Sequence, residues 1–169
     1  MEWQASIMLV ALCALYGITF FTDIRYRKIY NSVTFPAMLI SFLACIYTSG
    51  FLNSIIFFFV VMVLCLVCEF MRFWKSGDSK LILAASMMTA LLLESITTFT
   101  AASFFLSVLM MYLFVGHCFW LKQCNYSLRK YFQELKSSFR QNQVIGRLPG
   151  AGWIGLANLL FLLIHYVPY

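Results

Sequence analysis

Long apolar runs alternate with short polar connections along the whole chain of 169 residues. A transmembrane helix needs about 20 mainly apolar residues to cross roughly 30 Å of hydrocarbon. Six runs approach that length, and they predict spans at about 3–22, 33–49, 51–71, 80–99, 101–121 and 151–168. The uncharged stretches TSGFLNS and SITTFTAAS separate spans two and three and spans four and five, which indicates tight hairpin turns. The pattern therefore predicts one all-α membrane domain over 1–169, a bundle of six transmembrane helices.

The composition supports a lipid environment. Apolar residues make up 63% of the chain and charged residues 11%, whereas soluble domains have roughly 45–50% and about 25%. A chain of this size that folded in water would leave much of its apolar surface exposed. We therefore expect the lipid bilayer to be its main solvent.

The basic residues are confined to three connections, after the first, third and fifth spans. They are Arg25, Arg27 and Lys28, then Arg72, Lys75 and Lys80, then Lys122, Arg129, Lys130, Lys136, Arg140 and Arg147. Connections that follow an odd number of crossings share one side of the membrane, and the positive-inside bias makes that side cytoplasmic, with both termini outside. The net charge of +6 thus reflects topology, and it predicts no nucleic-acid partner.

Two aspartates, Asp23 and Asp78, adjoin these connections. Asp78 precedes an apolar run, where an aspartate readily caps a helix and suits the positive end of the helix dipole. Asp23 follows an apolar run, where the dipole disfavours a negative charge, so an ion pair with Arg25, Arg27 or Lys28 is its structural alternative. The parity of the crossings places both carboxylates at one face of the membrane, where a compact bundle can bring them together.

A pair of carboxylates at one site also has a chemical interpretation. Two such groups do not both ionise easily, so one keeps a proton near neutral pH. The ionised partner then takes a proton from water while the protonated partner assists the departing group, as in aspartic peptide hydrolysis. Asp23 and Asp78 are therefore the candidate catalytic residues. Their titration would belong to the pair, and nearby Arg25 and Lys80 would favour ionisation.

Two motifs in the chain resemble those of the type IV prepilin peptidases and archaeal preflagellin peptidases. DIRYRKIYN is similar to their D-x-R-x-x-x-I-P-N stretch, and SGDSKL is similar to their G-x-G-D-x-K-L stretch. RLPGAGWIG resembles, more loosely, the beginning of their last span. The matching positions are Asp23, Arg25, Ile29 and Asn31, then Gly77, Asp78, Lys80 and Leu81, and in the looser match Pro149, Gly150 and Gly155.

The resemblance implies a membrane aspartic peptidase that removes the leader of a pilin-like precursor at the cytoplasmic face of the bacterial inner membrane, without a cofactor. Asp23 and Asp78 would be catalytic, and the supporting positions would be Arg25, Asn31, Gly77, Lys80 and Pro149. The cysteine-bearing module that methylates the product in longer relatives is absent, which implies a peptidase-only form similar to that of tight-adherence (Flp) pili. Tyr30 and Ser76 depart from the family's Pro and Gly without removing a catalytic group.

Other polar residues give weaker signals. Glu69, at the cytoplasmic end of the third span, is interpreted as a side chain that extends to the interface. The lone His117 and His165 and the membrane-embedded pair Cys65 and Cys68 predict no metal site.

The connection 122–150 contains a second kind of pattern. Apolar residues recur at helical spacing at Leu128, Phe132, Leu135 and Phe139, among basic residues. This predicts an amphipathic helix on the cytoplasmic membrane surface, with guidance of a substrate or partner as the alternative.

Two other functions remain alternatives to a peptidase. A catalytically inactive assembly subunit of a pilus or secretion system would use the aspartates only as ion-pair partners of Arg25 and Lys80. A small transporter would place its charges near the bilayer midplane, often in repeated halves, whereas these aspartates lie at one face. Loss of cleavage upon removal of either carboxylate would distinguish a peptidase from both.

Overall fold

The computed structural model describes residues 2–26, 28–71, 73–140 and 150–166, and in these ranges the chain forms helices and no strand. The helices are α1 (Glu2–Tyr26), α2 (Asn31–Ser49), α3 (Phe51–Phe70), α4 (Ser76–Leu92), α5 (Thr98–Gln123), α6 (Leu128–Arg140) and α7 (Gly150–Tyr166). Each predicted span corresponds to one helix, and α6 occupies the last connection. The predicted all-α class is confirmed.

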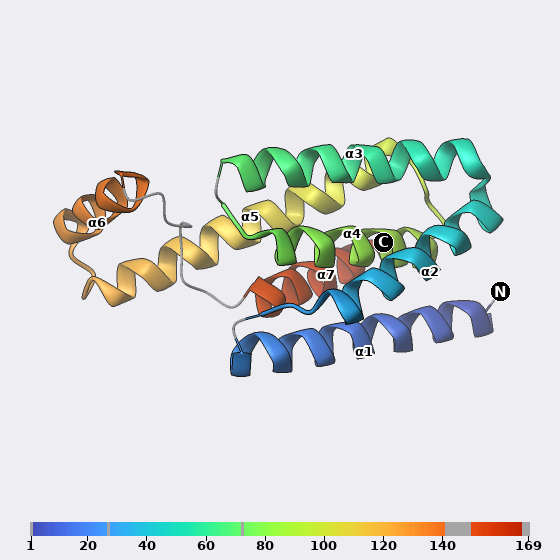
Figure 1. The fold of residues 1–169 in the computed structure, drawn as a ribbon, viewed down its shortest axis with the longest axis horizontal. Coiled ribbons are helices and arrows are strands. Elements are labelled where there is room, and N and C mark those ends of the chain that lie inside the picture. Colours follow the sequence, from blue (N-terminus) through green and yellow to red (C-terminus); the bar gives the residue numbers. More distant parts are fainter. Residues whose placement is uncertain (1, 27, 72, 141–149, 167–169) are drawn as a thin grey trace.

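Successive helices of the bundle run in opposite directions (Figure 1). The connections from α1 to α2 and from α3 to α4 lie at one end of the bundle, as does the arm made by the end of α5 and by α6, whereas α1 begins at the other end. The basic connections therefore share one end, as the parity of the crossings predicts. The cytoplasmic orientation of that end stays a prediction.

Helix α4 forms the centre of the bundle. It contacts α1, α2, α3, α5 and α7, and 12 of its 17 residues are buried. The small side chains of Ala84, Ala85 and Ala90, none of them exposed, allow neighbouring helices to approach closely. Within the described residues, α1 from Ser6, α2, α3 and α5 as far as Lys122 are long and apolar enough to cross a membrane, and α7 is a shorter apolar helix. Because other helices surround α4, it needs a less apolar surface than they do.

The boundary between α4 and α5 differs from the prediction. Apolarity predicts a span over 80–99, but α4 ends at Leu92 and α5 begins at Thr98. Glu94 has a φ of 50°, in the left-handed region that ends a helix. Thr97 then caps α5, because its hydroxyl oxygen accepts the backbone N–H of Thr100 at 3.1 Å. Capping residues, and not the extent of the apolar run, set the boundary.

The hairpin between α2 and α3 is as tight as predicted, since Gly50 alone separates the two helices. Its φ of +82° lies in the left-handed region, where glycine has no steric penalty. Its N–H donates to the carbonyl of Ile46 at 3.0 Å and closes the last turn of α2. The sharp reversal lays α2 and α3 against each other, and both pack on α4.

Helix α6 lies on the extension of α5, away from the other helices (Figure 1). Tyr131 attaches it there: its hydroxyl hydrogen-bonds to Nδ1 of His117, and its ring packs edge-on against Trp120 with centroids 5.5 Å apart. Leu128 and Phe132 are exposed, while the side chains of Leu135 and Phe139 fall outside the described residues. The predicted helix is confirmed, and its contact with a membrane surface stays a prediction.

Candidate active site

Asp23 lies in the last turn of α1, which continues to Tyr26, and the residue is only 6% exposed. At this negative end of the helix dipole a carboxylate needs compensation. One of its oxygens, Oδ2, accepts the backbone N–H of Ala151 at 3.1 Å. Ala151 is the second residue of α7, so the positive end of that helix faces the Asp23 carboxylate.

The basic residues near Asp23 have other surroundings. The Arg25 guanidinium lies 6.0 Å from the ring centroid of Phe21 and 5.5 Å from that of Tyr26, both on its own helix. Lys28 is exposed, and Arg27 lies outside the described residues. The partner described for Asp23 is thus the backbone N–H of Ala151 in α7, whereas the ion-pair alternative gave it Arg25, Arg27 or Lys28.

Asp78 is the third residue of α4 and caps that helix from within. Its Oδ2 atom accepts the backbone N–H of Lys75, the N-cap residue, at 3.1 Å. A lysine side chain has no acceptor atom, so the Asp78 carboxylate supplies this cap. The capping role is confirmed, although at the third helical position and not at the N-cap.

Gly150, the first residue of α7, packs directly on the Asp78 carboxyl group. A Cβ atom built on Gly150 would lie 1.9 Å from Oδ1 of Asp78 and 2.6 Å from its Cγ. No residue other than glycine allows this approach of the backbone. Consecutive residues of α7, Gly150 and Ala151, therefore contact the two carboxyl groups, and the N-terminus of α7 lies at both.

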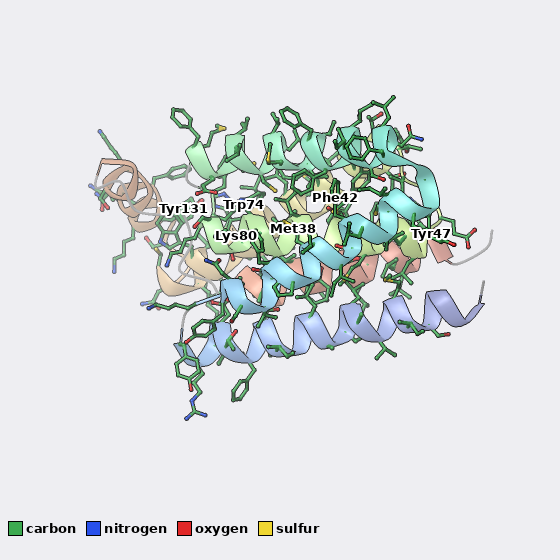
Figure 2. The ribbon with its side chains drawn as sticks, turned by 45° about the vertical axis from the view of Figure 1, so that its right-hand side comes forward. Met38, Phe42, Tyr47, Trp74, Lys80 and Tyr131 are labelled. Carbon is green, nitrogen blue, oxygen red and sulfur yellow. The ribbon has the colours of Figure 1, made fainter. Side chains whose placement is uncertain are left out.

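The two motifs also contact each other directly. The ammonium group of Lys80 donates to Oδ1 of Asn31 at 2.9 Å, and a Cβ on Gly77 would lie 3.3 Å from Cβ of Ile29. Glycine at position 77 could serve an unusual backbone angle or a close approach of another segment. The structure shows the close approach, to Ile29. Figure 2 shows Lys80 and Trp74 toward the end of the bundle that carries Tyr131, with Tyr47 at the other end.

Burial raises the pKa of Asp78 to about 6, from an ordinary 3.8. Asp78 precedes the stretch predicted to enter the membrane at 80–99. The charges of Asp23 and Glu69 also raise this pKa, whereas the backbone N–H and the ammonium group of Lys75 lower it. At pH 7 a carboxyl group with this pKa is protonated in about one molecule in ten. Asp78 therefore retains its proton to a higher pH than an ordinary aspartate does, although most molecules are ionised at pH 7.

Aromatic rings and a third carboxylate surround the start of α4. Trp74 is 2% exposed and packs edge-on against Phe105 and Tyr112, with centroids 5.7 and 5.6 Å away. Its indole N–H donates to Oγ of Ser79 at 3.1 Å, and that hydroxyl donates to Oε2 of Glu69 at 3.1 Å. Glu69 therefore accepts a hydrogen bond from the start of α4. Its interpretation as a side chain that extends to the interface stays a prediction.

The comparisons with known proteins identify a family. The model of the type IV leader peptidase family matches residues 9–116, more than half of the chain. The chain belongs to the type IV leader peptidase family. Neither the curated proteins nor the solved structures include a match. Membership of a leader peptidase family implies a peptidase, and the apolar helices suggest that it works in a membrane.

The family match includes Asp23, Arg25, Asn31, Gly77, Asp78 and Lys80. It ends before Gly150 and Ala151, the residues of α7 that contact the two carboxyl groups in this leader peptidase family member. The other predicted supporting residue, Pro149, lies outside the described residues. Within the described ranges, no group of three or more His, Cys, Asp or Glu residues is placed to hold a metal ion.

Proposed function

We propose that this protein is a prepilin leader peptidase in which Asp23 and Asp78 form an aspartyl dyad. One observation carries the proposal: carboxyl groups 55 positions apart in the sequence lie against consecutive residues at the start of α7. Each carboxyl group accepts a backbone N–H, that of Ala151 for Asp23 and that of Lys75 for Asp78. Family membership supplies the reaction class, and this geometry supplies candidate residues for it.

The dyad hydrolyses a peptide bond by exchanging protons with water. The ionised carboxylate takes a proton from a water molecule, whose oxygen forms a bond to the carbonyl carbon, while the protonated carboxyl group gives its proton to the carbonyl oxygen. The tetrahedral diol then collapses. The C–N bond breaks, the departing nitrogen receives the proton taken from water, and a diol hydroxyl returns a proton to the other carboxylate. One water molecule is consumed, and both aspartates regain their starting states.

The site suits a substrate with a basic leader followed by an apolar helix. Both carboxyl groups lie at the end of the bundle where the basic connections gather, which by the positive-inside bias is cytoplasmic. The leader of a pilin precursor would stay in water at this end, and its apolar helix would lie beside the spans of the peptidase. The bond between them then falls at the level of the dyad, at the cytoplasmic face of the inner membrane.

The test is mass spectrometry of a candidate pilin co-expressed with the wild-type protein, Asp23→Asn or Asp78→Asn, at equal amounts in the membrane. The leader should be lost only with the wild type. Glu94→Gln is the matched control, because 16 residues separate Glu94 from Asp78. At a helical rise of 1.5 Å per residue this separation is about 24 Å. Glu94→Gln should cleave as the wild type does.

Leader removal by either aspartate variant would contradict the dyad. Failure of the wild type with a panel of pilin precursors, in membranes that contain the folded protein, would instead favour an inactive assembly subunit. The two failures differ, since only the first leaves a working peptidase.

A further inference from the structure

A cavity of about 430 Å³ lies between α1 and α7, near the end of α4. Its walls include Leu9 and Cys13 of α1, Leu159 and Leu162 of α7, and Leu92 of α4. Cys13 and Leu159 are also exposed on the outer surface of the bundle. The cavity is therefore a recess in the side of the bundle that a membrane would cover.

The chemistry of the walls selects an apolar occupant. Tyr16 and Asn158 also line the cavity, but Nδ2 of Asn158 donates to the Tyr16 hydroxyl at 2.8 Å, and Oδ1 of Asn158 accepts the Thr89 hydroxyl at 3.0 Å. These polar groups satisfy one another between α1, α7 and α4. The remaining walls are mostly leucine side chains, so an occupant gains by apolar burial and not by hydrogen bonding.

The cavity and the dyad lie on the same seam between α1 and α7. Between them the two helices are closely packed, since a Cβ on Gly152 would lie 3.0 Å from the Phe20 ring and a Cβ on Gly155 3.2 Å from the Tyr16 ring. Along α1, Cys13 precedes Asp23 by ten residues, or about 15 Å at 1.5 Å per residue. Along α7, Leu159 follows Gly150 by nine residues, or about 14 Å. Both helices therefore place the cavity at the same depth in the bundle relative to the dyad.

We propose that this cavity holds the apolar helix of the precursor, parallel to α7, with residues about seven to fourteen positions after the cleaved bond in contact with its walls. The inference rests on the proposed function. Lipid chains have access to every outward face of the bundle, whereas a helix that begins at the two carboxyl groups reaches the level of this recess about ten residues later. Cavity occupancy would thereby set which bond reaches the dyad.

Disulfide cross-linking to the natural Cys13 tests the register. The Asp78→Asn variant, which retains the precursor, is oxidised with pilins that carry one cysteine at successive positions 5–16 after the cleavage bond. Cross-links to Cys13 should peak about ten positions after that bond and recur at helical spacing. Cys118 of α5, also exposed, is the internal control and should not show this pattern. Cross-links without a register, or equal capture by Cys118, would overturn the proposal.

A pair of neighbouring tryptophan substitutions tests occupancy in the active enzyme. Leu159→Trp fills the cavity, while Leu160→Trp adds the same ring on a 41% exposed neighbour outside its walls. With equal amounts of both variants in the membrane, Leu159→Trp should lower the rate of leader removal at least tenfold and Leu160→Trp less than twofold. If the wild type cleaves and Leu159→Trp cleaves equally fast, the cavity holds lipid and the proposal fails, although the peptidase stands. If no wild-type cleavage occurs with any pilin, the proposed function fails first.

Discussion

Substitution of Gly150 by alanine is the sharpest test of the site geometry. The new methyl group would lie 1.9 Å from Oδ1 of Asp78, and an ordinary contact begins at 3.4 Å. About 1.5 Å of movement must therefore occur, either in the start of α7 or in the Asp78 carboxyl group. Movement of α7 carries the Ala151 N–H away from Asp23, and rotation of Asp78 breaks its cap on Lys75. Either response disturbs the dyad.

The expected magnitude follows from that displacement. A misplacement of about 1 Å in a catalytic group costs roughly 100-fold in rate. Gly150→Ala should accordingly reduce the kcat/KM for leader removal about 100-fold or more, which corresponds to about 3 kcal/mol of transition-state stabilisation. The helix itself should tolerate the change, because alanine has a higher helix propensity than glycine.

The assay is the rate of precursor cleavage by purified protein in lipid nanodiscs, followed by mass spectrometry. Gly17→Ala is the control, since a Cβ at Gly17 meets nothing within 4 Å. Gly17→Ala should retain the wild-type rate. If Gly150→Ala, folded and inserted, keeps more than a third of the wild-type rate, the close contact between α7 and Asp78 does not govern catalysis and the reasoning is refuted.

Three further predictions address pH, the link between the motifs and the buried amide. Because the folded pKa of Asp78, about 6, exceeds its ordinary 3.8, the folded state binds this proton more tightly and loses stability as pH rises from about 4 to above 6. Asp78→Asn should therefore raise the free energy of unfolding by up to about 3 kcal/mol at pH 7.5 and by much less at pH 4, which is measured as a higher melting temperature. An equal gain at both pH values would contradict this. Lys80→Met and Asn31→Leu should be non-additive in a double-mutant cycle of unfolding, by about 1 kcal/mol for an exposed charge-assisted bond, and strict additivity would show that the bond contributes nothing. Asn158→Leu should cost about 1–2 kcal/mol of stability, measured by melting in detergent, because it leaves the Tyr16 hydroxyl unpaired in a buried site, so an unchanged melting temperature would argue against the bridge.

The helices and the meeting of the aspartates follow from the sequence because both depend on the membrane. Apolar length predicts each helix of the bundle, and the positions of the basic residues predict which connections share an end. Asp23 and Asp78 must then lie at one level, whichever helices separate them. The predicted end of the fourth span at residue 99 is wrong. The left-handed Glu94 and the Thr97 cap end the helix at Leu92. Such local capping contributes little to hydropathy.

The role of α7 could not be predicted in the same way. Gly150 and Ala151 act through the backbone, as a gap for a carboxyl oxygen and as an N–H donor, and the side-chain chemistry of a motif does not record such roles. The loose resemblance of RLPGAGWIG is the signal that was present. The hydrogen bond between Ser79 and Glu69 could not be predicted for a related reason, since it depends on how α3 packs on α4.

The structure also distinguishes the two aspartates, which sequence motifs treat alike. Asp23 accepts an N–H from the positive end of α7, so an ionised Asp23 has a donor in place. Asp78 faces a glycine on one side and buried aromatic residues nearby, and burial raises its pKa to about 6 while Asp23 and Glu69 add to the rise. Asp78 therefore retains a proton to a higher pH than an ordinary aspartate does. In the proposed mechanism, the N–H donor at Asp23 and the raised pKa of Asp78 suit Asp23 as the group that takes the proton from water and Asp78 as the group that protonates the carbonyl oxygen. This difference arises because one helix end approaches both carboxyl groups but donates an N–H to only one of them.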